Sequence, residues 1–136
     1  MKNIFLLALL AAFAGGCKKV PGEGGNSSIS GNVLKEYRLV LSNPATEQYT
    51  TAAADEDVYI VYGAHTSPDD KVQTNYDGDF EFRNLRPGDY TIYVYSKDTT
   101  GATQVDENRM PIILDVEISD KKQELVVDDV TIYDEI

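Results

Sequence analysis

The side chains that most often carry chemistry are sparse in this sequence. His65 is the only histidine and Cys17 the only cysteine. Acyl-transfer catalysis needs a nucleophile, an activating base and a group that orients the base. Asp69 and Asp70 follow His65, but no Gly-x-Ser-x-Gly elbow is present. Zinc sites normally use several histidine or cysteine ligands. The sequence therefore predicts a histidine in a surface loop, no catalytic residues and no metal or cofactor.

A second pattern offers oxygen ligands at alternate positions. Asn75, Asp77 and Asp79 have the spacing found at the start of a calcium loop. An EF-hand loop requires glycine at its sixth position and a distal glutamate, whereas Gly78 is fourth here. The pair Asp77-Gly78 is typical of a tight hairpin turn. We therefore expect a turn here and no calcium site.

The N-terminus has the pattern of an export signal. Lys2 precedes an apolar run over residues 4–14, and small residues lead from that run to Cys17. The run is shorter than the about 20 residues of a membrane-spanning helix, so we expect it to be cleaved. The sequence "AGGC" at residues 14–17 resembles the lipobox of bacterial lipoproteins. This resemblance implies removal of residues 1–16 and acylation of Cys17, with chains such as palmitate anchoring the protein. The alternative is a secreted protein with a free thiol.

The net charge of the chain excludes some classes of binding partner. The chain has a net charge of −11, and loss of Lys2 with the signal would make it more negative. Nucleic-acid binding requires a basic surface, so we expect no nucleic-acid partner. The same charge argues against a domain that lies flat on anionic lipid, although Lys18 and Lys19 would be beside the lipid anchor.

Three segments organise the chain. Residues 1–16 are the expected lipoprotein signal peptide. Residues 17–28 are rich in glycine and serine, and this composition predicts a flexible lipidated tether. Residues 29–136 have the length of one domain.

The domain has the pattern of an all-β protein. Apolar and polar residues alternate with the two-residue period of half-buried strands. This alternation covers residues 29–33, 37–41, 58–62, 79–83, 90–95 and 114–119, and a last apolar segment covers 124–133. Turn residues such as Asp77-Gly78 and Pro87-Gly88 separate the segments. The pattern predicts a single antiparallel β-sandwich of approximately seven strands. Residues 42–57 could form a loop, a helix or a strand, and residues 98–109 a loop.

Residues 72–96 carry a family resemblance. They contain Asp77-Gly78, Phe80-x-Phe82, Asn84-Leu85 and Pro87-Gly88-Asp89-Tyr90. This succession resembles the carboxypeptidase regulatory-like domain and its prealbumin-like (transthyretin-like) relatives. The resemblance implies a prealbumin-like sandwich that acts as a stalk, spacer or binding module, and it supplies no catalytic residues. The rival fold is an immunoglobulin-like or fibronectin-like sandwich.

Two surface features have candidate functions. If Tyr90, Ile92 and Val94 face the core, then Tyr93 and Tyr95 face outward, and the same parity places Tyr59 outward. Exposed tyrosines on adjacent strands form an amphipathic surface that stacks on sugar rings or binds proteins. Asp98-Thr99-Thr100 is similar to an O-glycosylation site of exported Gram-negative proteins, with Thr99 as the acceptor.

These observations predict a non-enzymatic, lipid-anchored module of the Gram-negative cell envelope. We expect an outer-membrane lipoprotein, facing the periplasm or the exterior, that binds or scaffolds a glycan or an outer-membrane protein. The alternative is a small structural subunit of a surface fibre or adhesin, built by strand addition at an open sheet edge.

Overall fold

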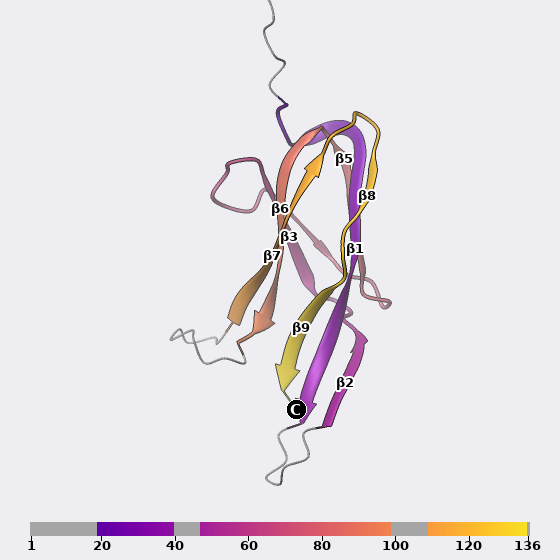
Figure 1. Cartoon of the computed structure of the whole chain (residues 1–136), viewed down its shortest axis with the longest axis vertical. Helices are drawn as coiled ribbons and strands as arrows, with labels where there is room; N and C mark the ends of the chain where they lie inside the picture. The colour runs from indigo at the N-terminus through magenta and orange to yellow at the C-terminus, as the bar shows by residue number, and fades with distance from the viewer. Residues whose placement is uncertain (1–18, 40–46, 99–108, 136) are drawn as a thin grey trace, which may run out of the picture.

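The computed structural model describes residues 19–39, 47–98 and 109–135, and they form an all-β, two-layer sandwich (Figure 1). The described residues contain nine strands and no helix. The strands are β1 (Glu23–Leu39), β2 (Glu47–Ala52), β3 (Asp57–Tyr62), β4 (Asp70–Gln73), β5 (Asp79–Leu85), β6 (Gly88–Lys97), β7 (Arg109–Ile118), β8 (Glu124–Val126) and β9 (Val130–Glu135).

Strand β1 organises the first sheet. β2 and β5 pair with β1 in antiparallel orientation, and β8 and β9 pair with it in parallel orientation. The second sheet is antiparallel throughout, in the order β4-β3-β6-β7. The predicted sandwich is confirmed, but two of its pairings are parallel rather than antiparallel.

The core lies between the two sheets and follows the predicted alternation. Along β6, Tyr90, Ile92 and Val94 are buried, whereas the side chains between them face outward. Along β5 the buried pair is Phe80 and Phe82, whose rings meet edge to face at 6.1 Å. Burial of these apolar side chains is the main force that holds the sheets together, since no disulfide is possible with one cysteine.

The strand predictions differ from the structure in three places. The expected segment at 29–33 and residues 37–39 of the next one belong to one continuous strand, β1, and residues 40–41 lie outside the described residues. The expected segment at 124–133 is divided into β8 and β9, because Asp128 and Asp129 are exposed between them. The segment 42–57, left open by its sequence, contains strand β2, and β4 was missed because its four residues are mostly exposed.

The expected tether overlaps the domain. β1 begins at Glu23, so residues 23–28 belong to a strand and this part of the tether prediction was wrong. At position 25, glycine is needed for close approach of two backbone segments rather than for flexibility. A Cβ on Gly25 would lie 1.9 Å from the carbonyl oxygen of Leu85, so only glycine fits there. Leu85 pairs with both Glu23 and Ser27, which marks an irregularity in the strand between them.

Tyr90 fixes the start of the domain. Its hydroxyl accepts a hydrogen bond from the backbone N–H of Gly22 at 2.9 Å and donates one to the carbonyl of Arg86 at 2.6 Å. The Arg86 N–H in turn donates to the Gly22 carbonyl at 2.8 Å. Burial raises the pKa of the Tyr90 phenol, which keeps it neutral and able to donate. The chain is therefore held to the sandwich from Gly22 onward.

The close approach at Gly25 gives a test of this correction. We expect Gly25→Ala to lower the free energy of unfolding by about 1–3 kcal/mol, because its Cβ would push β1 away from β5. Equilibrium urea denaturation followed by circular dichroism measures the change. Asn26→Ala is the matched control, since Asn26 is exposed. Equal stability of the two variants would show that this segment behaves as a tether.

Candidate functional site

The outer face of the second sheet carries an aromatic surface. The strand register places Lys71, Tyr59, Tyr93 and Ile113 side by side across β4, β3, β6 and β7. The adjacent row continues through Gln73, Asp57, Tyr95 and Pro111. We call these eight residues the tyrosine platform. It contains all three tyrosines that the sequence placed on this face.

The three rings of the platform touch one another. Tyr59 and Tyr93 are stacked at 5.0 Å with an interplanar angle of 10°. Tyr95 meets both edge to face, at 5.8 Å from Tyr59 and 5.5 Å from Tyr93. Tyr95 is 41% exposed and Ile113 56% exposed, whereas Tyr59 and Tyr93 are half-buried. The pair Tyr59–Tyr93 thus supports an accessible ring and an accessible aliphatic side chain.

Charged groups border the rings on the β4 side. The Lys71 ammonium lies 5.9 Å from the centre of the Tyr59 ring and 3.0 Å from Asp57 Oδ2. The hydrogen bond from Lys71 lowers the pKa of Asp57, so the carboxylate is ionised at neutral pH. The other oxygen, Asp57 Oδ1, is buried and has no hydrogen-bond partner among the described residues. The border therefore offers a cation and a carboxylate, of which a ligand can reach Oδ2 but not the buried Oδ1.

Two polar hollows adjoin the platform. One, of about 220 Å³, is lined by Asp55, Glu56, Asp57, Tyr59, Gln73, Tyr95 and Arg109. The other, of about 270 Å³, is lined by Lys35, Glu56, Tyr95, Lys97, Arg109, Ile132, Tyr133 and Asp134. Glu56, Tyr95 and Arg109 line both. The hollows are therefore adjacent, and the exposed ring of Tyr95 stands between groups that can donate and accept hydrogen bonds.

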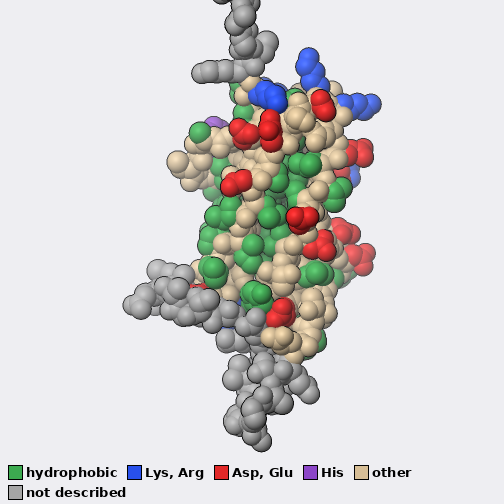
Figure 2. All heavy atoms as spheres, viewed as in Figure 1, with side chains coloured by type: hydrophobic (Ala, Val, Ile, Leu, Met, Phe, Trp, Pro, Cys, Tyr) green, Lys and Arg blue, Asp and Glu red, His purple; other side chains and the backbone are tan. Residues whose placement is uncertain are grey.

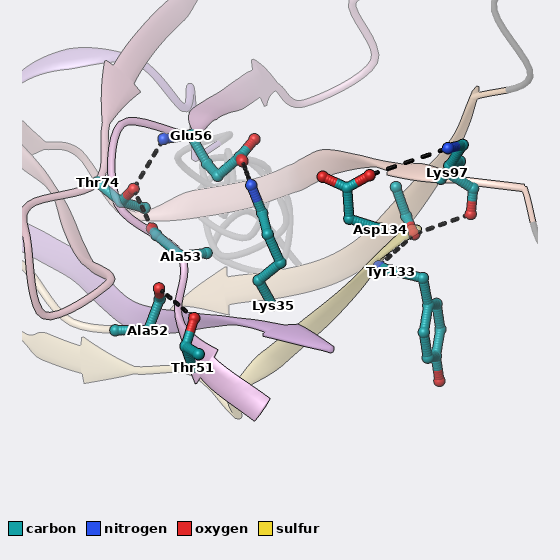
Figure 3. A network of polar contacts seen from close by, with 10 residues as sticks. Lys35, Thr51, Ala52, Ala53, Glu56, Thr74, Lys97, Tyr133 and Asp134 are labelled. Carbon is teal, nitrogen blue, oxygen red and sulfur yellow. Dashed lines mark hydrogen bonds and ion pairs between the residues drawn. The ribbon is translucent and has the colours of Figure 1, made fainter. Parts of the chain in front are cut away.

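A polar network supports the floor of the second hollow (Figure 3). Lys35 of β1 and Glu56 point toward each other and form a half-buried ion pair. Thr74 donates to the Ala53 carbonyl at 2.5 Å and accepts from the Glu56 N–H at 2.9 Å, which positions Glu56. Burial alone would lower the pKa of Lys35, but the hydrogen bond and charge of Glu56 outweigh it and the pKa is raised. The Lys35 ammonium is therefore charged at neutral pH.

The other side chains considered from the sequence have structural contacts. His65 is 62% exposed, and its Nδ1 lies 2.8 Å from Asp69 Oδ1. Asp69 also accepts the Tyr62 N–H at 2.7 Å, which is the main reason that its pKa is lowered. His65 and Asp69 therefore close a surface loop, which agrees with the expected surface histidine.

The expected turn at residues 75–79 is present. Asn75 Oδ1 accepts the backbone N–H groups of Asp77 and Asp79, both at 2.9 Å, and Gly78 has φ +81°. The Asn75 amide oxygen, which was weighed as a calcium ligand, thus accepts the hydrogen bonds of the turn. The described residues contain no group of three or more His, Cys, Asp or Glu arranged to hold a metal ion.

Two predicted sites lie outside the described residues: Cys17, the expected lipidation site, and Thr99, the expected glycan acceptor. Within the described part of the chain, no helix is long and apolar enough to cross a membrane.

Sequence reasoning missed most of the polar border. Asp57 has the same parity as Tyr59, so the alternation alone could have placed it beside the ring. Lys71 and Gln73 required β4, whose exposed residues carry no strand signal. Arg109 required the register of β7 on β6, which places it opposite Lys97. Ile113 and Ile118 lie on opposite faces of β7 by the two-residue period, so the burial of Ile118 places Ile113 outward.

The described residues thus define a two-layer β-sandwich with an aromatic platform on one sheet and polar hollows beside it. Two similarities of this chain to known proteins were found. A family model described as the Y_Y_Y domain matches residues 66–128, slightly less than half of the chain. A solved structure of a candidate carbohydrate binding protein from Pseudomonas aeruginosa is similar at 15% sequence identity with a TM-score of 0.44. This likeness covers 79% of this chain and 90% of the other. No curated protein matches the sequence.

The Lys35–Glu56 pair gives a test of the network. We expect Glu56→Gln to lower the free energy of unfolding at neutral pH by about 1–2 kcal/mol, between the values for exposed and buried pairs. Because the folded-state pKa of Lys35 is raised, this contribution is complete below the unfolded-state pKa of about 10.4 and is lost as pH rises through the folded-state value. The stability difference between wild type and Glu56→Gln should therefore shrink above pH of about 10.4.

Urea denaturation across this pH range measures the difference. Glu81→Gln is the control, because within the described residues Glu81 pairs only with Arg83, whose side chain is 74% exposed. The control should be close to wild type at every pH. A Glu56→Gln difference that is constant through the alkaline range would contradict the role of the ion pair.

Proposed function

We propose that this protein is a non-enzymatic, lipid-anchored module of the bacterial cell envelope, and that its tyrosine platform binds a glycan. The observation that carries the proposal is the contact of three tyrosine rings on one open sheet face, with polar hollows on either side of Tyr95.

The chemistry of the platform matches that of a sugar ring. One face of a pyranose presents C–H groups, which pack on an aromatic ring, and its edges present hydroxyl groups that donate and accept hydrogen bonds. Tyr95 supplies an accessible ring, while Asp57 and Arg109 supply an acceptor and a donor beside it. A flat, open surface accepts one segment of an extended polymer better than it encloses a small molecule. A polysaccharide is therefore the favoured ligand over a free monosaccharide.

Replacement of the accessible ring tests glycan binding. We expect Tyr95→Ala to weaken binding roughly five- to ten-fold, because one aromatic contact is lost while the Tyr59–Tyr93 stack remains. A glycan array of bacterial and host polysaccharides would identify a ligand, and isothermal titration calorimetry would measure its affinity.

Tyr76→Ala is the control for that measurement. Tyr76 is 89% exposed and lies outside the platform, so its loss should leave affinity unchanged. Equal effects of the two substitutions, or no glycan bound by the wild type, would contradict binding at the platform.

The proposed anchor rests on the lipobox-like sequence that ends at Cys17. Acyl chains on this residue would hold the sandwich at a membrane, with the outer membrane as the proposed location. We expect Cys17→Ala to move the protein from the membrane to the soluble fraction and to remove the acyl mass from the N-terminal peptide. Membrane fractionation and mass spectrometry measure both. Unchanged membrane association of the variant would contradict the lipid anchor.

We further assign the sandwich to the prealbumin-like group. The assignment is supported by the motif segment 72–96, which folds as β5, the Pro87-Gly88 turn and β6. Within it, Phe80, Phe82 and Tyr90 are buried, as that motif requires.

The alternative role, a fibre subunit assembled by strand addition, would need an open edge. Strand β7 lies at the edge of its sheet and pairs only with β6 within the described residues. Pro111 and the outward charges Asp115 and Glu117 lie on β7. Proline and charge are the residues that natural edge strands use to limit pairing with other chains. This composition supports a monomeric binding module over a fibre subunit.

A further inference from the structure

Cationic side chains gather at the end of the sandwich where the described chain begins. A hollow of about 460 Å³ there is lined by Lys19, Val20, Gly24, Gly25, Asn26, Arg86, Pro87 and Lys121. We call it the basic hollow. On the face drawn in Figure 2, Lys and Arg side chains concentrate at this upper end, whereas Asp and Glu side chains are spread along the molecule. The lining of the basic hollow thus contains three cationic side chains and no carboxylate, in a protein that is acidic as a whole.

The ion pairs of the described residues explain why this charge is available. Elsewhere the lysines and arginines are mostly neutralised: Lys35 by Glu56, Lys71 by Asp57, Arg83 by Glu81 and Lys97 by Asp134. At the basic hollow only Lys19 has an ion pair, with Glu117 at 3.0 Å. Arg86 and Lys121 form none within the described part of the chain. Their charges are therefore free to meet an external anion.

The position of the hollow in the chain specifies the source of that anion. Lys19 is two residues from Cys17, so its Cα lies within about 7 Å of the Cα of the proposed lipidated residue. Gly22 is already held by Tyr90, so no long tether separates the sandwich from the membrane. Any lipid attached at Cys17 would therefore bring phospholipid headgroups to the basic hollow.

We propose that the basic hollow binds the phosphate of an anionic phospholipid headgroup and holds the sandwich end-on against the membrane. This inference rests on the proposed lipid anchor and goes beyond the proposed glycan binding. Guanidinium and ammonium groups are the natural donors to phosphate oxygens.

The net charge of −11 does not oppose this contact. Electrostatic interactions in solution are screened over about 8 Å at physiological ionic strength. Carboxylates farther along the sandwich lie beyond that distance from a membrane at the basic hollow. Near the surface, each Lys or Arg adds to the attraction toward anionic lipid.

End-on contact also sets the height of the tyrosine platform above the membrane. Pro87 lines the basic hollow at the start of β6, and Tyr95 lies seven residues beyond Gly88 on that strand. At about 3.3 Å per residue, the platform is roughly 20 Å farther from the membrane. The proposed glycan site would therefore lie on the side of the sandwich, clear of the lipid surface.

The test uses the full-length protein in vesicles of phosphatidylcholine alone or mixed with phosphatidylglycerol. An amine-reactive label read by mass spectrometry reports the exposure of each lysine. We expect the reactivity of Lys121 to fall several-fold in phosphatidylglycerol vesicles only, and that of Lys71 to stay constant. Arg86→Gln should restore Lys121 reactivity, because an unpaired donor to the phosphate is lost. Arg83→Gln removes the same charge outside the hollow and should change nothing.

Three outcomes would overturn the proposal, and each is separable from failure of the anchor. Equal Lys121 reactivity in both vesicles, in protein shown by mass to be acylated and by flotation to be vesicle-bound, excludes headgroup binding. Equal protection by soluble glycerol phosphate excludes a membrane contact. Equal effects of Arg86→Gln and Arg83→Gln exclude the hollow. If Arg86→Gln does not fold, Lys121→Gln with Lys19 as the reporter replaces it. Absence of acylation would instead refute the proposed anchor.

Discussion

The first sheet depends on a single strand. Every other strand in it, β2, β5, β8 and β9, pairs with β1, so the sheet exists only if β1 stays extended from Glu23 to Leu39. This length is possible because glycine at position 25 lets β1 pass against the carbonyl of Leu85, where any Cβ would collide. At the same end, the Tyr90 hydroxyl joins Gly22 and Arg86. A few backbone contacts at the start of the domain therefore determine where the sandwich begins.

The sequence predicted the buried faces well and the ends of the domain poorly. The two-residue period of β5 and β6 identifies Phe80, Phe82 and Tyr90 as core residues because one-sided burial requires that alternation. The glycines at 22–25 were interpreted as a linker, since composition does not distinguish a flexible glycine from one in close backbone contact. The platform was foreseen as tyrosines by parity. Its polar border was not, because Arg109 and Lys71 reach it through strand pairing that the local sequence does not encode.

The surface chemistry is divided along the length of the sandwich. Aromatic and hydrogen-bonding groups gather beside Tyr95, and unpaired cations gather beside Pro87. In the first region, Lys71 lowers the pKa of Asp57 and so holds its carboxylate in ionised form, and Lys35 forms an ion pair with Glu56. In the second region, Arg86 and Lys121 have no carboxylate partner among the described residues. One small domain thus presents two distinct surfaces, separated along the length of β6.

The parallel pairing of β1 with β9 has a mechanical consequence. Their register runs from Val33↔Val130 to Arg38↔Glu135, and the chain enters β1 and leaves β9 at opposite ends of the molecule (Figure 1). Tension between the two ends of the chain would pull these neighbours in opposite directions along their own axes. The hydrogen bonds between them would then bear the load together in shear, instead of opening one after another from one end. Hydrogen bonds loaded in shear would give the domain a higher unfolding force than its free energy of unfolding alone suggests. The reason is that forced unfolding is governed by the unfolding rate.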